Sequence, residues 1–301
     1  VTKARAAYQL AFAANPHDAR LLYELDQLEK RAGAGPQERL ARLEAHRELV
    51  NSRDDLTVEF VTLLNQLGRP AEALLLLGSR RFNPWEGGEG AVSGQYVWAH
   101  ILLGRRALEA GEFEKALEHF EAARRYPENL GEGKHLLTPE HHLDFWSGLA
   151  ADGLGRNEEA RRFWERAAAV TTDVRPMWFY RAQALAKLGR EKEAEALLGE
   201  MKRWAEHQLQ SDPKIDYFAT SLPNFLLFED DLHKRNEIDC RFIMALADIG
   251  LGRSETATDG LRRVLALDPN HLAAQEELRT PTGERYEAIA VVDPPGNQER
   301  A

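Results

Sequence analysis

Hydrophobic residues recur along most of the chain at spacings of three and four positions, which places them on one face of an α-helix. The pattern is clearest in "LLGRRALEAGEFEKALEHFEAA", where Gly104 is followed by Gly111 after seven residues, Ala116 after five, Phe120 after four and Ala123 after three. Three further stretches keep these steps with substitutions: Gly148, Gly155, Ala160, Trp164 and Ala167; Ala182, Gly189, Ala194, Leu198 and Met201; and Ala245, Gly252, Ala257, Leu261 and Val264. This recurrence indicates an internal repeat.

Each position in the repeat has a physical task. The small residue that opens it, such as Gly104, lets a neighbouring helix approach closely, and the glycine seven positions later ends its helix in a left-handed conformation. The last three positions of the repeat form the stripe by which a second helix packs on the first. They hold an alanine, then a large apolar residue, then an alanine, methionine or valine. The pattern therefore predicts helical hairpins with hinges at Gly33, Gly68, Gly111, Gly155, Gly189 and Gly252.

Two copies near the start of the sequence are weaker. Around Gly33, Glu38 and Arg42 occupy the positions expected for the Ala and the large apolar residue. "KARAAYQLAFAANPHD" supplies only the second helix of a repeat. We therefore expect the array to start in the middle of a repeat and the chain to be a piece of a longer protein.

These hairpins resemble tetratricopeptide repeats, whose unit has about 34 residues. The resemblance implies an all-α fold, a right-handed solenoid of about six hairpins over residues 1–278, followed by an irregular tail over residues 279–301. "RTPTGERYEAIAVVDPPGNQERA" has no helical stripe, and we expect this tail to dock along the solenoid.

The distances between the hinge glycines locate inserted residues. Gaps of 35 and 34 residues correspond to one repeat, whereas gaps of 43, 44 and 63 require insertions. The predicted inserts are Arg80–Gly94, Pro127–His142 and Asp212–Asp239, and they contain aromatic residues that a disordered linker would lack. Long loops within a compact array are commonly functional, so these inserts are the first places to look for a site.

The inserts carry a second resemblance. "RRFNPWEGGEG", "YPENLGEGK" and "DYFATSLPNFLLFEDDLHKRN" resemble the C-terminal helical region of bacterial proteins that join an N-terminal β-sandwich, similar to sugar mutarotases and glycoside-processing proteins, to tetratricopeptide repeats. The resemblance covers residues 56–269 and implies an architecture and a carbohydrate-linked context, but no reaction. No such sandwich is expected within these residues.

The first two inserts offer candidate binding residues. Trp85 has an aromatic face on which a sugar ring can stack, and the carboxylates of Glu86 and Glu89 can accept hydrogen bonds from hydroxyl groups. The alternative is a compact loop whose Trp fills a gap in the core beneath it. In "NLGEGK", Glu132 and Lys134 could hold a polar ligand, or the segment could only turn a corner.

Acidic and histidine-rich stretches have two interpretations each. Asp230 and Asp231 could face a glycosidic bond as paired carboxylates, but adjacent acids followed by basic residues are more typical of an exposed helix start. "HHLDFW" invites a metal interpretation, yet neighbouring histidines on a helix diverge by about 100°. We favour a helix start there, with Thr138 as N-cap and Pro139 at the first position.

The tryptophans divide by their place in the repeat. Trp164 stands at the large apolar packing position and is predicted to lie in the core. Trp98, Trp146 and Trp178 lie in first helices, which line the concave face of such solenoids. Trp98 is therefore a further candidate for ligand contact, with core packing as the alternative.

Composition restricts the partners. The net charge of −10 opposes binding to phosphate backbones, and the sequence has no apolar run of the roughly 20 residues that span a bilayer. Cys240 is the only cysteine, which excludes an intrachain disulfide and suits the cytoplasm. No motif predicts a cofactor or a metal site. Neither nucleic acid nor membrane is expected as a partner.

These observations favour an interaction scaffold without catalytic residues in this piece. We expect its groove and inserts to bind its own N-terminal domain, a segment of a partner protein or a second copy of the chain. The alternative is an accessory part of a carbohydrate-active enzyme, with carbohydrate as ligand, whose site an N-terminal β-sandwich completes.

Overall fold

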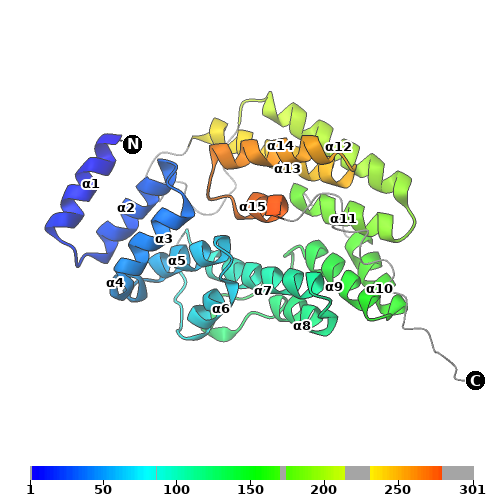
Figure 1. Ribbon diagram of the computed structural model, residues 1–301, viewed down its shortest axis with the longest axis horizontal. Coiled ribbons are helices and arrows are strands. Elements are labelled where there is room, and N and C mark those ends of the chain that lie inside the picture. Colours follow the sequence, from blue (N-terminus) through cyan, green and yellow to red (C-terminus); the bar gives the residue numbers. More distant parts are fainter. Residues whose placement is uncertain (1, 86, 170–173, 214–230, 280–301) are drawn as a thin grey trace, which may run out of the picture.

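The computed structural model describes residues 2–85, 87–169, 174–213 and 231–279, and this part of the chain is all-α, without a strand (Figure 1). It contains one 3-10 turn, Glu128–Leu130, and fifteen α-helices. The helices are α1 (Thr2–Ala14), α2 (Ala19–Arg31), α3 (Pro36–Ala45), α4 (Arg47–Ser52), α5 (Asp54–Gln66), α6 (Pro70–Gly78), α7 (Ala91–Glu109), α8 (Phe113–Ala123), α9 (His141–Gly153), α10 (Asn157–Ala169), α11 (Arg175–Lys187), α12 (Glu191–Leu209), α13 (Leu232–Gly250), α14 (Ser254–Leu267) and α15 (Leu272–Arg279).

The predicted hairpins are confirmed. They are α2/α3, α5/α6, α7/α8, α9/α10, α11/α12 and α13/α14, and each turns at one of the six predicted glycines, all of which have φ between 70° and 86°. At every hinge the residue after the glycine donates its backbone N–H to the carbonyl five residues earlier, as Arg156 does to Ala151 at 2.9 Å. This bond satisfies a carbonyl at the helix end that would otherwise have no partner within its helix.

Small residues permit close packing within the hairpins, as predicted. A Cβ on Gly104 would lie 2.4 Å from the ring of Phe120, and one on Gly148 would lie 2.2 Å from the indole nitrogen of Trp164. Ala116 and Ala160, at the equivalent position of two second helices, are fully buried. Trp164 is buried as well, which confirms that it belongs to the core.

The hairpin at Gly33 differs from the others by one residue. Its second helix α3 begins three positions after the glycine, whereas the other second helices begin two positions after theirs. The packing positions are therefore not Glu38 and Arg42, as predicted, but Arg39 and Leu43, both fully buried. A charged residue thus stands where each of the other hairpins has a buried alanine.

The ends of the predicted inserts were partly wrong. Helix α7 already begins at Ala91, so the first insert is shorter than Arg80–Gly94. Helix α9 begins at His141, so Thr138 is not its N-cap and the residue before the helix is Glu140. At α7, packing against neighbouring helices extends the helix into residues whose intrinsic preference does not predict one, whereas α9 begins two residues later than predicted.

The third insert is also shorter than predicted. Helix α13 begins at Leu232, so residues 232–239 are helical and only part of Asp212–Asp239 connects α12 to α13. Asp231 is the N-cap of α13, and its carboxylate accepts the backbone N–H of Lys234 at 3.0 Å. The helix-start interpretation holds for Asp231. Asp230 lies outside the described residues.

The hairpins follow one another along a curve that nearly closes on itself (Figure 1). The last hairpin α13/α14 comes to lie across from α5 and α7, and α15 lies inside the curve between them. Buried apolar residues form two clusters that meet on α7, where Ala99 belongs to the N-terminal cluster and Ile101 to the other. The predicted tail over residues 280–301 lies outside the described residues.

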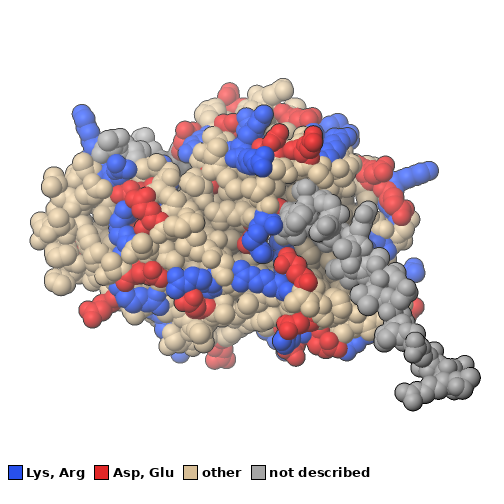
Figure 2. Space-filling view, in the orientation of Figure 1, with Lys and Arg blue, Asp and Glu red and all other residues tan. Residues whose placement is uncertain are grey.

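Acidic and basic side chains are interspersed over the face shown in Figure 2, and no large area of one sign is seen there. Among the described residues, none of the helices combines the length and the apolar character needed to cross a membrane.

Candidate interaction site on the concave face

The first two inserts lie side by side. Phe82 donates its backbone N–H to the carbonyl of Asn129 at 2.8 Å, and the Asn129 side-chain amide donates to the carbonyls of Leu77 and Arg80, both at 2.8 Å. A Cβ on Gly131 would lie 2.5 Å from the Phe82 carbonyl oxygen, so glycine is required at this contact.

Glu132 links the second insert to the start of α7. Its carboxylate accepts the backbone N–H groups of Gly90 and Ser93, both at 3.0 Å, and the hydroxyl of Ser93 at 2.5 Å. A negative charge at this end of a helix is stabilised by the helix dipole. Glu132 therefore has a structural task, and its contact with a ligand stays a prediction.

Lys134 contacts the end of α8 and the approach to α9. Its ammonium lies 2.6 Å from a carboxylate oxygen of Glu140 and 3.3 Å from the carbonyl of Arg124. Arg124 in turn pairs with Glu140 at 3.1 Å and with Asp144 at 2.7 Å. These ion pairs hold the second insert against the array. A ligand role for Lys134 also stays a prediction.

Trp85 is half-buried and packs against the N-terminal cluster. Its indole lies on the backbone of Gly88, where a Cβ would be 2.0 Å from Trp85 Cε2. These contacts agree with the interpretation of Trp85 as a residue that fills a gap beneath its own loop. Glu89 is exposed, and Glu86 lies outside the described residues.

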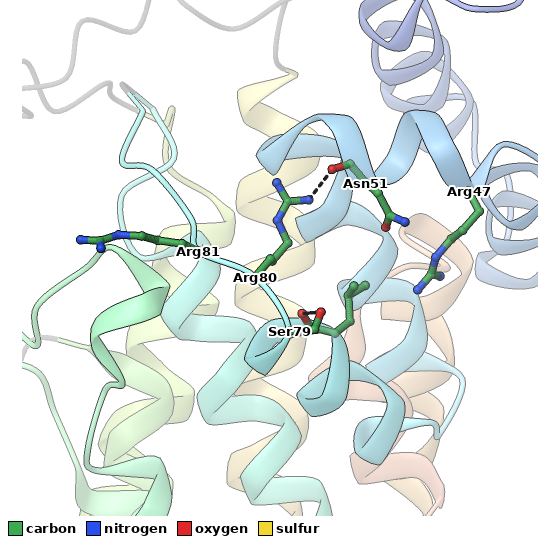
Figure 3. Close-up of a pocket in the computed structure, with 6 residues that line it drawn as sticks. Arg47, Asn51, Ser79, Arg80 and Arg81 are labelled. Atoms are coloured by element: carbon green, nitrogen blue, oxygen red, sulfur yellow. Dashed lines mark hydrogen bonds between the residues drawn. The ribbon is translucent and has the colours of Figure 1, made fainter.

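A hollow of about 550 Å³ lies at the root of the first insert (Figure 3). It is lined by Arg47, Asn51, Leu76, Ser79, Arg80 and Arg81. Arg80 donates to the Asn51 carbonyl at 2.9 Å and to the Thr57 hydroxyl at 2.7 Å, and it pairs with Asp54, while Arg81 points away from them. Because these bonds use Arg80 to connect the first insert to α4 and α5, we assign the hollow a structural role and not a binding role.

A second hollow, of about 220 Å³, lies on the concave face and is mostly apolar. Five helices and the segment after α8 contribute to it. Its lining consists of Gly94, Val97, Trp98 and Ile101 from α7, Tyr126, His142 from α9, Pro176, Met177 and Tyr180 from α11, Phe242 and Leu246 from α13, and Ala273 and Glu277 from α15. We refer to it as the concave pocket. Trp98 is half-buried there, so this predicted residue does face an open space.

His142 adds a polar group to the concave pocket. Its ring lies 5.8 Å from that of Tyr180, and its Nδ1 atom is buried without a hydrogen-bond partner. Burial, together with the positive charge of Arg124, lowers the pKa of His142 to about 3. The imidazole is therefore neutral at physiological pH and can give or take one hydrogen bond at Nδ1.

The size of the concave pocket restricts its occupant. Sites for cofactors and drug-sized ligands have volumes of about 300 to 1,000 Å³. A pocket of about 220 Å³ is better matched by one large apolar side chain. Among the described residues, no group of three or more His, Cys, Asp or Glu side chains is placed to hold a metal ion.

The six hinges share one backbone geometry, and five of the six hairpins share one set of packing positions, with the Gly33 hairpin shifted by one residue. The fold is a tetratricopeptide-like helical repeat. No family model matches the chain. A crystal structure of a tetratricopeptide repeat protein from Parabacteroides merdae matches with 13% identity over 92% of this chain and 91% of that chain, with a TM-score of 0.47. The TPR domain of P58(IPK) matches with 14% identity over 96% and 87%, with a TM-score of 0.30. The predicted β-sandwich and its carbohydrate context stay predictions.

The residues that close the array were missed at the sequence level. Arg39 is fully buried and donates to Asp26 at 3.0 Å and 2.5 Å, to Glu59 at 2.6 Å and to the side chain of Asn270 at 2.9 Å. Burial alone would raise the pKa of Glu59, but Lys30 and Arg39 lower it to about 2. The extra residue in the Gly33 hinge is the signal that could have placed Arg39 in the packing seam.

A histidine pair lies inside the α7/α8 hairpin. The Nδ1 atoms of His100 and His119 are 3.1 Å apart. Burial and the neighbouring His119 lower the pKa of His100 to about 4, and burial lowers the pKa of His119. Both rings are therefore neutral in the folded chain at pH 7.

Acidification is expected to destabilise the fold between about pH 6.5 and pH 4. An unfolded histidine binds a proton near pH 6.5, whereas His100 in the folded chain does so only near pH 4. The unfolded state therefore binds more protons in this window, and the free energy of unfolding falls as the pH falls. When the free energy of unfolding is measured with urea at several pH values in this window, it should depend less on pH for His100→Gln than for the wild type. The exposed His17→Gln should match the wild type, and a wild-type slope for His100→Gln would contradict the prediction.

Proposed function

We propose that this protein is a non-catalytic scaffold whose concave face binds a segment of a partner polypeptide. The observation that supports the proposal best is the concave pocket, an apolar hollow of about 220 Å³ open on the inner side of the array. Trp98, Met177 and Tyr180 offer it the aromatic and thioether surface that is typical of peptide grooves.

The arrangement supports a polypeptide rather than a small molecule in two ways. The pocket accommodates one apolar anchor side chain, and the first helices on either side of it continue the same inner surface for flanking residues. The neutral His142 supplies a hydrogen-bonding atom beside the apolar anchor, which fixes the orientation of a bound segment.

A pocket-filling variant tests the proposal. A Cβ on Gly94, which lines the pocket, meets no atom within 4 Å, so Gly94→Leu should fill the space without a clash. Peptides selected from a random library on the wild-type chain, and then measured by fluorescence anisotropy, should bind Gly94→Leu at least tenfold more weakly. The melting temperature should be equal or higher, because leucine has the higher helix propensity.

Gly78→Leu is the matched control. Gly78 is also helical, also has free space around a Cβ and does not line the pocket, so this variant should keep wild-type affinity. Selected peptides that bind both variants equally well would reject the concave pocket as the site. Failure to select any peptide, combined with retention of an oligosaccharide in a Trp85-dependent manner, would favour the carbohydrate alternative.

A further inference from the structure

Helix α15 occupies the concave face in the way that a bound segment would. It lies inside the curve of the array and reaches helices that precede it by more than 150 positions (Figure 1). Its N-terminal side is held by Asn270, which donates to the Ala34 carbonyl at 3.1 Å, accepts from Arg39 at 2.9 Å and accepts from Gln66 through its backbone carbonyl.

The other end of α15 is held by an ion pair. Glu277 accepts from Arg105 on α7 at 3.0 Å, and both side chains are almost fully buried, at 3% and 4% exposed. Between the two anchors α15 contributes little apolar bulk, with Leu272 and Ala274 buried. An eight-residue helix is not stable alone, so these contacts determine where it lies.

The concave pocket borders α15 directly. Ala273 and Glu277 form part of its lining, together with Trp98 and Tyr180. The inner surface therefore extends beyond α15, and a segment in the pocket would lie against α15 or replace it. Because the cost of burying two charges offsets most of their attraction, the Arg105–Glu277 pair fixes the position of α15 more than it stabilises it.

We propose that α15 is an exchangeable occupant of the concave face, and that the partner segment is an amphipathic helix that presents a carboxylate to Arg105 in place of Glu277. This inference rests on the proposed function, because it names the kind of segment that the concave face binds. In this proposal α15 is an intramolecular ligand of the same kind as the partner helix. The partner helix binds as α15 leaves the concave face.

The test uses the full chain and a labelled synthetic peptide with the sequence of residues 268–279, DPNHLAAQEELR. In the Glu277→Arg chain, two guanidinium groups face each other and α15 should leave the groove. Its amides should exchange hydrogen at least tenfold faster, and the chain should bind the peptide at least tenfold more tightly than the wild type does. The Glu206→Arg chain, with the same charge change at an exposed position of α12, should behave as the wild type.

Reversing the charges of the Arg105–Glu277 pair distinguishes recognition of the carboxylate by Arg105 from a general loss of fold stability. A chain with Arg105→Glu and Glu277→Arg should protect α15 again, and the Arg105→Glu chain should bind a peptide carrying Glu277→Arg in preference to the native peptide. If Glu277→Arg prevents folding, Glu277→Gln serves in the same measurements, with smaller effects in the same direction.

Two outcomes would overturn the inference. Wild-type protection of α15 in a folded Glu277→Arg or Glu277→Gln chain, with no gain in peptide affinity, would show that α15 is a permanent part of the core. Equal binding of the native and charge-reversed peptides would show that Arg105 does not recognise the carboxylate. In either case, the proposed function would still stand if library peptides bind the wild-type chain and lose affinity for Gly94→Leu. Conversely, if α15 is released in the Glu277→Arg chain but no selected peptide depends on Gly94, only the proposed function would be rejected.

Discussion

Ala160→Asp is expected to lower the free energy of unfolding by about 3 to 5 kcal/mol. Ala160 is fully buried where α10 packs on α9, so a carboxylate at this position would be removed from solvent. The charge would have to be desolvated or the seam would have to open. Thermal denaturation followed by circular dichroism should show a melting temperature lower by on the order of 10 °C. Ala116→Asp, at the same position of α8, should behave alike.

Ala196→Asp is the control for this prediction. Ala196 is exposed in the interior of α12, another second helix, so the substitution changes helix propensity but buries no charge. Its cost should be about 0.5 kcal/mol. Similar melting temperatures for the buried and exposed variants would mean that the packing register of the hairpins is wrong.

Arg39→Met is expected to cost about 3 to 5 kcal/mol, because it leaves the carboxylate of Asp26 buried without its guanidinium partner. Asp26 is itself fully buried and cannot turn to solvent, and the Asn270 side chain loses an interaction at the same time. Urea unfolding measures the loss. Hydrogen exchange should report faster opening at both ends of the array, around α3 and around α15.

Two comparisons make this second prediction specific. Arg161→Met removes an exposed Arg–Glu pair on α10, and such pairs are worth between 0 and about 1 kcal/mol. Adding Asp26→Leu to Arg39→Met should restore part of the stability, since no unpaired charge then remains buried. A loss for Arg39→Met no larger than that for Arg161→Met would contradict the buried network.

The predictions that held depend on local sequence. A hinge glycine and the alanine five positions later act within one hairpin, so the spacing of Gly155 and Ala160 is enough to place both. The placement of Arg39 failed because one extra residue in the Gly33 hinge shifts the register of α3. Insert ends such as Ala91 failed because tertiary packing extends the helices.

The site was less predictable than the fold. Glu132 and Trp85 were noticed as unusual loop residues, but the sequence does not reveal that one caps α7 and the other packs on Gly88. Trp98 was placed on the concave face by its position in a first helix, and that reasoning needs only the repeat. The contact between Arg105 and Glu277 joins residues 172 positions apart, and no local pattern relates them.

The bond between Arg39 and Asn270, which joins residues 231 positions apart, has a consequence for how the chain folds. In an open solenoid each repeat contacts only its neighbours, so the terminal repeats fray independently and hairpins can add one at a time. Closure couples the α2/α3 hairpin to the segment that leads into α15, because the buried pair of Arg39 and Asp26 gains its contact with Asn270 only when these distant parts of the chain meet. Such a long-range contact is expected to form late in folding, and its loss in unfolding is expected to weaken both of the regions that it joins.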